Sequence, residues 1–173
     1  MFKKIELINS EKNHFRLHKK LDVLLPQSDF WWQGDENDYS AGLSAYDKES
    51  REFIGSLQVY LADFDDDEPI IDDLSENEVA RVDEFLKTEI SKQFTLVEWM
   101  GSQLNTKDWG KGLVTAYIVQ ESATRATQFL SVRARLKGVR FVVIGSFNTA
   151  KKDVAASLIF GAVGSLLASA AES

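Results

Sequence analysis

Cysteine is absent from the 173-residue sequence. Its absence excludes a disulfide framework, a thiolate nucleophile and every cysteine-ligated zinc or iron–sulfur site, and it suits a reducing compartment. The N-terminal segment MFKKIELINSEKNHFRLHKK also lacks an apolar run of signal-peptide length. We therefore expect a cytoplasmic protein.

Basic residues are in the minority. The chain has 20 lysines and arginines against 27 aspartates and glutamates, which gives a formal net charge of −7 at pH 7. Nucleic-acid binding requires clustered basic side chains at the phosphates, so we do not expect a nucleic-acid partner. An acidic chain is better matched to a basic protein surface.

Prolines are also scarce. The two that occur, Pro26 and Pro69, lie beside polar or acidic residues where turns are expected. The sequence contains no internal repeat and no low-complexity linker, and its length is that of one ordinary domain. Residues 1–173 are therefore predicted to form a single domain.

Alternation of apolar and polar residues predicts strands in the first third of the chain. Leu21, Val23 and Leu25 alternate before Pro26 and indicate a strand that ends at a proline turn. The segments YSAGLSAYD and EFIGSLQVYLADF flank the polar DKESR, and we expect them to pair as a hairpin.

The hydrophobic period then changes to that of a helix. Ser75 and Glu78 have the spacing of a capping box at its start. The apolar stripe predicted to face the sheet consists of Val79, Val82, Phe85, Leu86 and Ile90.

Two more hairpins and a terminal helix follow. TLVEWMGSQL is expected to pair with LVTAYIVQ across DWGKG, and FLSVRARL with the return strand Val139 to Ser146. That return strand is apolar on both faces, which predicts layers on both sides of the sheet. Asn148 or Thr149 caps a helix that runs to about Ala170. The predicted fold class is α+β, a mostly antiparallel sheet with helices packed on it as an α/β/α sandwich.

This order of elements, with LDVLLPQSDFWW leading from Pro26 to Trp31 and Trp32, resembles the PsbP-like and DcrB-like α/β/α sandwich over nearly the whole chain. The resemblance implies a non-enzymatic binding protein. Proteins of this kind include photosystem extrinsic subunits, a nuclear Ran-release factor and Eag-type chaperones of type VI secretion effectors. The chain differs from the photosystem group by lacking a targeting segment, and no binding residue of the family maps onto a matched position.

Motifs for catalysis or metal binding are incomplete. Asp63, Asp65 and Asp67 have the first spacings of an EF-hand loop, but the sixth position is Glu68 and the twelfth is Leu74, so we expect no calcium site. No serine lies in a nucleophile elbow, and DWGKGL lacks the Walker spacing. The two histidines, His14 and His18, are interpreted as surface residues. We expect no enzyme activity, metal or cofactor.

Two segments supply candidate partner-binding residues. Three adjacent aromatics in FWWQGDE cannot all face the core, because successive side chains of a strand point to opposite faces. At least one is expected to be exposed or to cover the rim of the sandwich. Between Asp63 and Glu78 there are nine acidic residues and no basic one, as in an electrostatic docking surface. The candidate residues are Phe30, Trp31, Trp32, Asp35, Glu36, Asp63, Asp65, Asp66, Asp67 and Glu68.

A basic stretch balances these acids. No acid occurs from Ser122 to Lys152, and a turn at Lys137-Gly138 would place Arg135 opposite Arg140. Such a pair repels unless an acid neutralises it. That acid would come from the chain's own middle segment or from an acidic partner, or else solvent screens the pair.

The terminal segment Val154 to Ala170 contains serines and glycines and is short for a membrane span, so none is predicted. Its apolar residues cover more than a narrow stripe. The helix must bury more than one side, either in its own sandwich or against a second copy, and a homodimer is predicted.

The leading functional hypothesis is a non-catalytic cytoplasmic protein-binding module, either a bacterial chaperone of a secreted effector or a toxin immunity protein, with a basic protein partner. The alternative is a small-molecule-binding or hydrolytic domain with a pocket near Trp31, Trp99 and Trp109. A structural subunit of a larger assembly is the third possibility.

Overall fold

The strands and helices are described from a computed structural model, which covers residues 1–19, 21–26, 29–61, 74–105, 111–136 and 139–172. The strands are β1 (Lys3–Lys4), β2 (Glu6–Asn9), β3 (His14–Leu17), β4 (Leu21–Leu24), β5 (Phe30–Glu36), β6 (Ser40–Asp47), β7 (Phe53–Leu61), β8 (Thr95–Asn105), β9 (Gly112–Ser122), β10 (Arg125–Leu136) and β11 (Val139–Asn148). The helices are α1 (Glu76–Gln93), the short η2 (Thr149–Lys151) and α2 (Lys152–Glu172).

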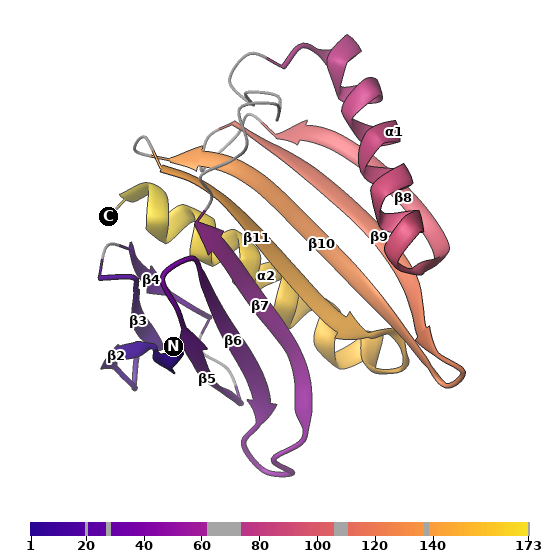
Figure 1. The fold of residues 1–173 in the computed structure, drawn as a ribbon. Helices are drawn as coiled ribbons and strands as arrows, with labels where there is room; N and C mark the ends of the chain where they lie inside the picture. The colour runs from indigo at the N-terminus through magenta and orange to yellow at the C-terminus, as the bar shows by residue number, and fades with distance from the viewer. Residues whose placement is uncertain (20, 27–28, 62–73, 106–110, 137–138, 173) are drawn as a thin grey trace.

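The main sheet has eight strands in the order β1-β5-β6-β7-β11-β10-β9-β8, paired antiparallel throughout (Figure 1). The three predicted hairpins β6–β7, β8–β9 and β10–β11 are all present. With two helices packed on this sheet, the predicted α+β class is confirmed.

A second sheet of three strands, β2-β3-β4, lies beside the main one. The predicted strand before Pro26 is β4, and it belongs to this small sheet, not to the main one. Its inward side chains Leu21 and Val23 join Phe15 and Leu17 of β3 in the core. Strands β1, β2 and β3 were not predicted from the sequence.

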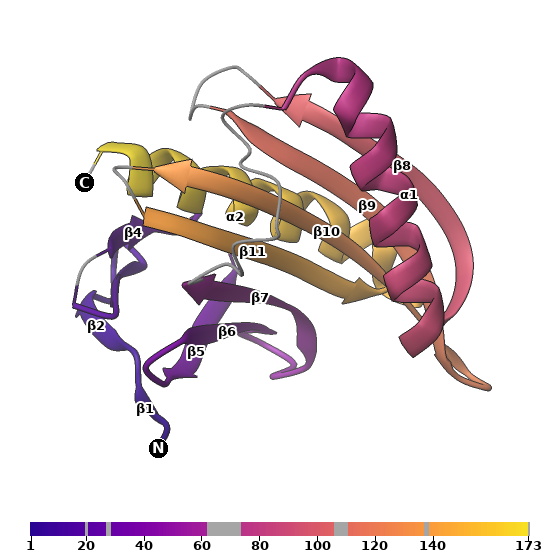
Figure 2. The same cartoon turned by 45° about the horizontal axis from the view of Figure 1, so that its top comes forward.

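Helix α2 lies between the two sheets, in contact with β7, β10 and β11 of the main sheet and with β4 of the small one (Figures 1 and 2). Its start is marked by Asn148, whose side-chain oxygen accepts a hydrogen bond from the Ala150 backbone N–H at 3.0 Å. At the other end of the helix, Ser169 Oγ accepts a hydrogen bond from the Leu24 backbone N–H at 3.2 Å.

This position accounts for the broad apolar surface of α2. Leu158, Ile159, Val163, Leu166 and Leu167 are buried, and Phe160 packs its ring against Phe147 with centroids 5.5 Å apart. Burial within the chain therefore accounts for part of the apolar surface that suggested a homodimer, and the homodimer stays a prediction. The segment Thr149–Ala171 is also long and apolar enough to cross a membrane, and 44% of its most apolar window is buried in this fold.

Helix α1 begins with the predicted capping box, in which Glu78 accepts a hydrogen bond from the Ser75 backbone N–H at 2.8 Å. The predicted apolar stripe is wrong at Phe85, whose side chain is 60% exposed. The reason is that α1 contacts the edge strand β8 and buries a narrow strip around Val82. Phe85 falls outside that strip.

The two helices lie on opposite faces of the main sheet. Leu113 of β9 clusters with Val82 of α1, whereas its neighbour Val114 packs against the core under α2. Successive strand side chains point to opposite faces, so α1 covers the outer face at the β8 end and α2 covers the inner face. In the described part of the chain, neither helix lies over the outer face of β5, β6 and β7.

Candidate binding surface

The outer face of β5, β6 and β7 forms an open trough of about 790 Å³. Its floor is made by outward-pointing residues of the central strand β6. Gln33 and Asp35 of β5 line one bank, and Ser56 and Gln58 of β7 line the other. The trough therefore follows the direction of the strands.

Strand alternation in SAGLSAYD creates the floor. Ala41, Leu43 and Ala45 of β6 are buried in the core, which turns Ser40, Gly42, Ser44 and Tyr46 outward. A Cβ added at Gly42 would meet no atom within 4 Å. A glycine and two serines leave the sheet surface low at this position, and the larger residues around it form the walls.

Aromatic rings stand at both ends of the trough. At one end the Tyr46 ring lies against Phe53, and Trp31 is stacked on Tyr46 with centroids 4.5 Å apart. At the other end Tyr60 is 39% exposed, and its hydroxyl donates a hydrogen bond to Gln58 at 2.8 Å. These rings offer apolar contact area beside a polar floor.

The aromatic triplet divides between the two faces of β5, as alternation requires. Trp31 faces outward toward Tyr46, and Phe30 is partly buried against the core. Trp32 is 6% exposed and belongs to the core cluster. Its assignment as a partner-binding residue is therefore corrected, because a partner cannot reach a side chain packed under the sheet.

The adjacent acids divide in the same way. Asp35 is exposed and lines the trough. Glu36 is buried, accepts a hydrogen bond from the His18 backbone N–H at 2.7 Å and lies 3.5 Å from Lys3 Nζ. Glu36 fastens the β3–β4 turn to the main sheet, so its assignment as a partner-binding residue is also corrected.

The acidic candidates Asp63, Asp65, Asp66, Asp67 and Glu68 lie outside the described residues, as do most of the EF-hand-like segment and Trp109. Within the described ranges, no three histidine, aspartate or glutamate side chains come together as metal ligands.

The described tryptophans around which a pocket was predicted do not come together, and of these Trp31 stands beside the trough. Trp31 lies on β5 and Trp99 on the edge strand β8, with the rest of the sheet between them. Trp99 instead stacks on Tyr117 and donates its indole N–H to both oxygens of Asp83 at 3.1 Å. Trp99 is therefore an anchor for α1.

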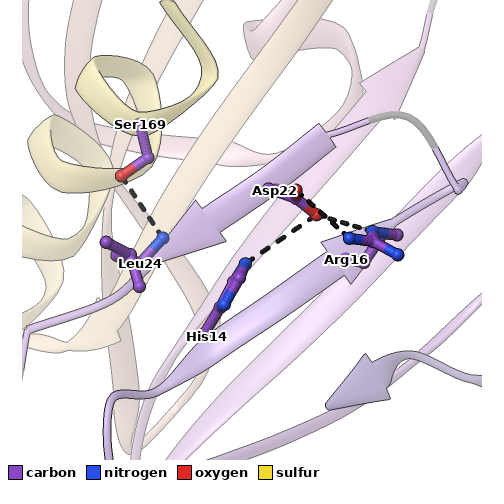
Figure 3. Close-up of polar contacts among 5 residues, drawn as sticks. All are labelled: His14, Arg16, Asp22, Leu24 and Ser169. Carbon is purple, nitrogen blue, oxygen red and sulfur yellow. Dashed lines mark hydrogen bonds and ion pairs between the residues drawn. The ribbon is translucent and has the colours of Figure 1, made fainter. Parts of the chain in front are cut away.

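A polar cluster on the small sheet joins His14, Arg16 and Asp22 (Figure 3). Arg16 Nε donates to Asp22 Oδ1 at 2.6 Å, and His14 Nε2 lies 3.8 Å from the same oxygen. The Arg16 hydrogen bond lowers the pKa of Asp22, and the same contact raises the pKa of Arg16. The carboxylate is already shared by two basic side chains on its own sheet, so the cluster is interpreted as a cross-strand staple.

The basic stretch has the predicted register, with Arg135 opposite Arg140. Two of its members pair with acids of the same chain: Arg125 lies 3.2 Å from Glu121, and Lys151 pairs with Glu52. At these two positions the chain itself supplies the neutralising acid.

Most of the trough residues were not among the predicted site residues, for example Gln33, Gly42, Ser44 and Gln58. A signal was available in YSAGLSAYD, where the outward positions are small although strands favour large and β-branched residues. Small residues on an otherwise regular strand indicate a surface left open.

No protein-family model and no characterised protein matches the sequence. Among solved structures, the chain is similar to the solution structure of cyanobacterial PsbP (CyanoP) from Synechocystis sp. PCC 6803. The two share 15% identity with a TM-score of 0.46, over 78% of this chain and 84% of that one. No functional residue is transferred at this level of likeness.

Proposed function

We propose that this chain is a non-catalytic protein-binding module whose partner binds in the trough. The observation that carries the proposal is the open outer face of β5–β7, over which neither helix packs in the described part of the chain. Low, polar side chains form the floor and exposed aromatics stand at the ends. This combination suits protein interfaces, where aromatic anchors supply much of the binding energy.

Charge supports a basic partner. The net charge of −7 attracts such a protein over a range set by ionic strength. More specifically, we propose that the protein is either a chaperone that holds a secreted bacterial effector or an immunity protein that neutralises a toxin. Both act by binding and require no catalytic group.

A small-molecule ligand is the second candidate, because the volume of about 790 Å³ falls within the range of ligand sites. Against it, the trough is open along its length. Lys4 and Asp35 are the charged side chains among its described lining, and they are register partners on β1 and β5.

The test fills the trough without disturbing the core. A Cβ added at Gly42 or at Gly161 meets no atom within 4 Å, so Gly42→Trp puts the ring over the trough and Gly161→Trp puts the same ring on an exposed position of α2. We expect proteins from the native cell to be retained by the wild type and by Gly161→Trp but not by Gly42→Trp. Calorimetry with the purified partner should show the same order.

If the wild type and both variants retain the same cellular proteins equally, and each has the wild-type melting temperature, then the trough is not the binding site. Retention of a metabolite instead of a protein, again lost in Gly42→Trp, would favour the second candidate.

A further inference from the structure

We infer that the trough receives an extended, uncharged segment of the partner polypeptide, which lies along β6. This inference rests on the proposed function and adds the form in which the partner is recognised.

The dimensions of the trough fit a single extended chain. The outward residues of β6 run from Ser40 to Tyr46, about 20 Å at about 3.3 Å per residue. The banks on β5 and β7 are two strand spacings apart, or about 10 Å. An extended segment of about six residues fills this length. A helix is about 10 Å across, which already equals the distance between the two banks and leaves no room for the side chains that line them.

The floor allows a backbone to approach the sheet closely. A glycine within a strand is found where a ligand or another backbone comes near, and Gly42 has open space where a side chain would stand. Gly42 lies directly between Asp35 and Gln58 in the register, at the middle of the trough.

The banks carry groups that match peptide bonds. Gln33 and Gln58 are both exposed, one on each bank, and each amide can donate and accept. The Gln58 oxygen already accepts from Tyr60, which orients this side chain. An extended main chain presents N–H and C=O groups alternately to its two sides, so amide side chains on both banks complement it.

The lining also selects against charge. Lys4 and Asp35 stand directly opposite each other on β1 and β5, so their charges offset. A charged side chain placed beside this pair would be attracted by one member and repelled by the other, so the lining gives it no net electrostatic gain. The segment is therefore uncharged, and the basic surface of the partner lies outside it, facing the acidic chain.

A sugar is disfavoured by the arrangement of the rings. Trp31 covers one face of Tyr46 with an interplanar angle of 18°, and Phe53 meets Tyr46 at 69°. Neither contact leaves Tyr46 as an open platform of the kind on which a pyranose ring would stack. Apolar side chains of a peptide can pack beside these ring edges.

A peptide selection tests the inference. Phage-displayed random peptides would be selected on immobilised wild-type protein after depletion on Gly42→Trp. We expect enrichment of runs of uncharged residues with apolar side chains at alternate positions. A synthetic peptide from this selection should lose at least tenfold affinity for Gly42→Trp in fluorescence polarisation, and several-fold for Gln58→Ala, with Gly161→Trp unchanged.

The outcomes separate this inference from the proposed function. If partner capture depends on Gly42 but no peptide is enriched, the trough binds a folded surface and the inference is wrong. If a glycan array gives binding that Gly42→Trp abolishes, the ligand is a saccharide and the inference is wrong. If partner capture ignores Gly42→Trp, the proposed function itself fails.

Discussion

Trp31 and Trp32 are neighbours in the sequence but serve different faces of β5. Trp31 stacks on Tyr46 beside the trough, and Trp32 lies in the core, where its indole Nε1 has no hydrogen-bond partner among the described residues. Asp35 and Glu36 divide between the two faces in the same way. The alternation of a strand, not residue type, therefore decides which aromatic or acid a partner can meet.

Trp32→Ala should destabilise the fold by about 3–5 kcal/mol, because it leaves a cavity in the core. Trp32→Phe should cost far less, since the lost volume is offset by removal of an unpaired buried N–H, itself worth about 1–3 kcal/mol. Urea unfolding of both variants measures this. Trp31→Ala is the matched control and should cost about 1 kcal/mol. Equal losses for Trp32→Ala and Trp31→Ala would contradict the assignment of Trp32 to the core.

Three exposed carboxylates are held ionised by local donors. A hydrogen bond from the Ser50 backbone N–H lowers the pKa of Asp47. The Arg16 guanidinium lowers the pKa of Asp22 in the same way. The Ser75 backbone N–H lowers the pKa of Glu78. Each group therefore contributes stability above its unfolded pKa, and that contribution disappears as the pH falls through the lower folded pKa.

Stability should accordingly be constant near neutral pH and decline below about pH 4. Asp22→Asn should be less stable than the wild type at pH 7, and the difference should shrink in acid, because the wild-type carboxylate is then protonated as well. Urea midpoints across this range provide the measurement. Asp38→Asn, which changes an exposed acid without an ion pair among the described residues, should track the wild type. A gap for Asp22→Asn that stays constant with pH would be inconsistent with this account.

At the scale of elements, the two helices differ in how firmly they are held. Helix α2 is packed between two sheets, and its Ile159 and Val163 lie directly on Gly145 of β11. Helix α1 contacts an edge strand, buries Val82 and is anchored by Asp83 to Trp99. In the described structure α2 is thus the more extensively packed helix, and α1 is held by fewer buried contacts.

Gly145→Ala should destabilise the protein by about 1–3 kcal/mol through overpacking. A methyl group there would lie 2.8 Å from Ile159 Cγ2 and 2.9 Å from Val163 Cγ2. Both neighbours are β-branched, so their stiff χ1 angles prevent them from moving aside. Gly42→Ala is the matched control on the open face and should change the free energy of unfolding by less than about 0.5 kcal/mol. A neutral Gly145→Ala would mean that α2 is not seated on the sheet as described.

At the scale of the whole molecule, a single core cluster runs from Ile5 to Ala170 and joins both sheets to α2. The small sheet covers part of the side of α2 that the main sheet leaves open, and Val154 stays 52% exposed. This core is formed by residues of one chain, without residues from a second copy.

We therefore expect the thermal unfolding midpoint to be independent of protein concentration. A dimer whose folding requires a second copy would show a midpoint that rises with concentration, by mass action. Melting curves over a hundredfold range of concentration, with sedimentation at both ends, make the comparison. A rising midpoint that becomes flat in Phe160→Asp would support the predicted homodimer through α2.

The sequence by itself determined the local structure of the longer elements. Alternation predicted β6, β7 and β10, a run that is apolar on both faces predicted β11, and the capping residues Ser75, Glu78 and Asn148 predicted where the helices begin. These features depend on contacts between residues close in the chain, so periodicity and spacing contain them.

The tertiary structure alone decided which surfaces remain open. Helix α1 packs on β8 and leaves Phe85 exposed. The small sheet packs against part of α2, and no described helix covers Gly42 and Gln58. Each outcome depends on which distant segment packs on a given face. A strand's alternation assigns its residues to two faces but does not specify what will cover either one. The candidate trough therefore became visible once the helices and both sheets were placed.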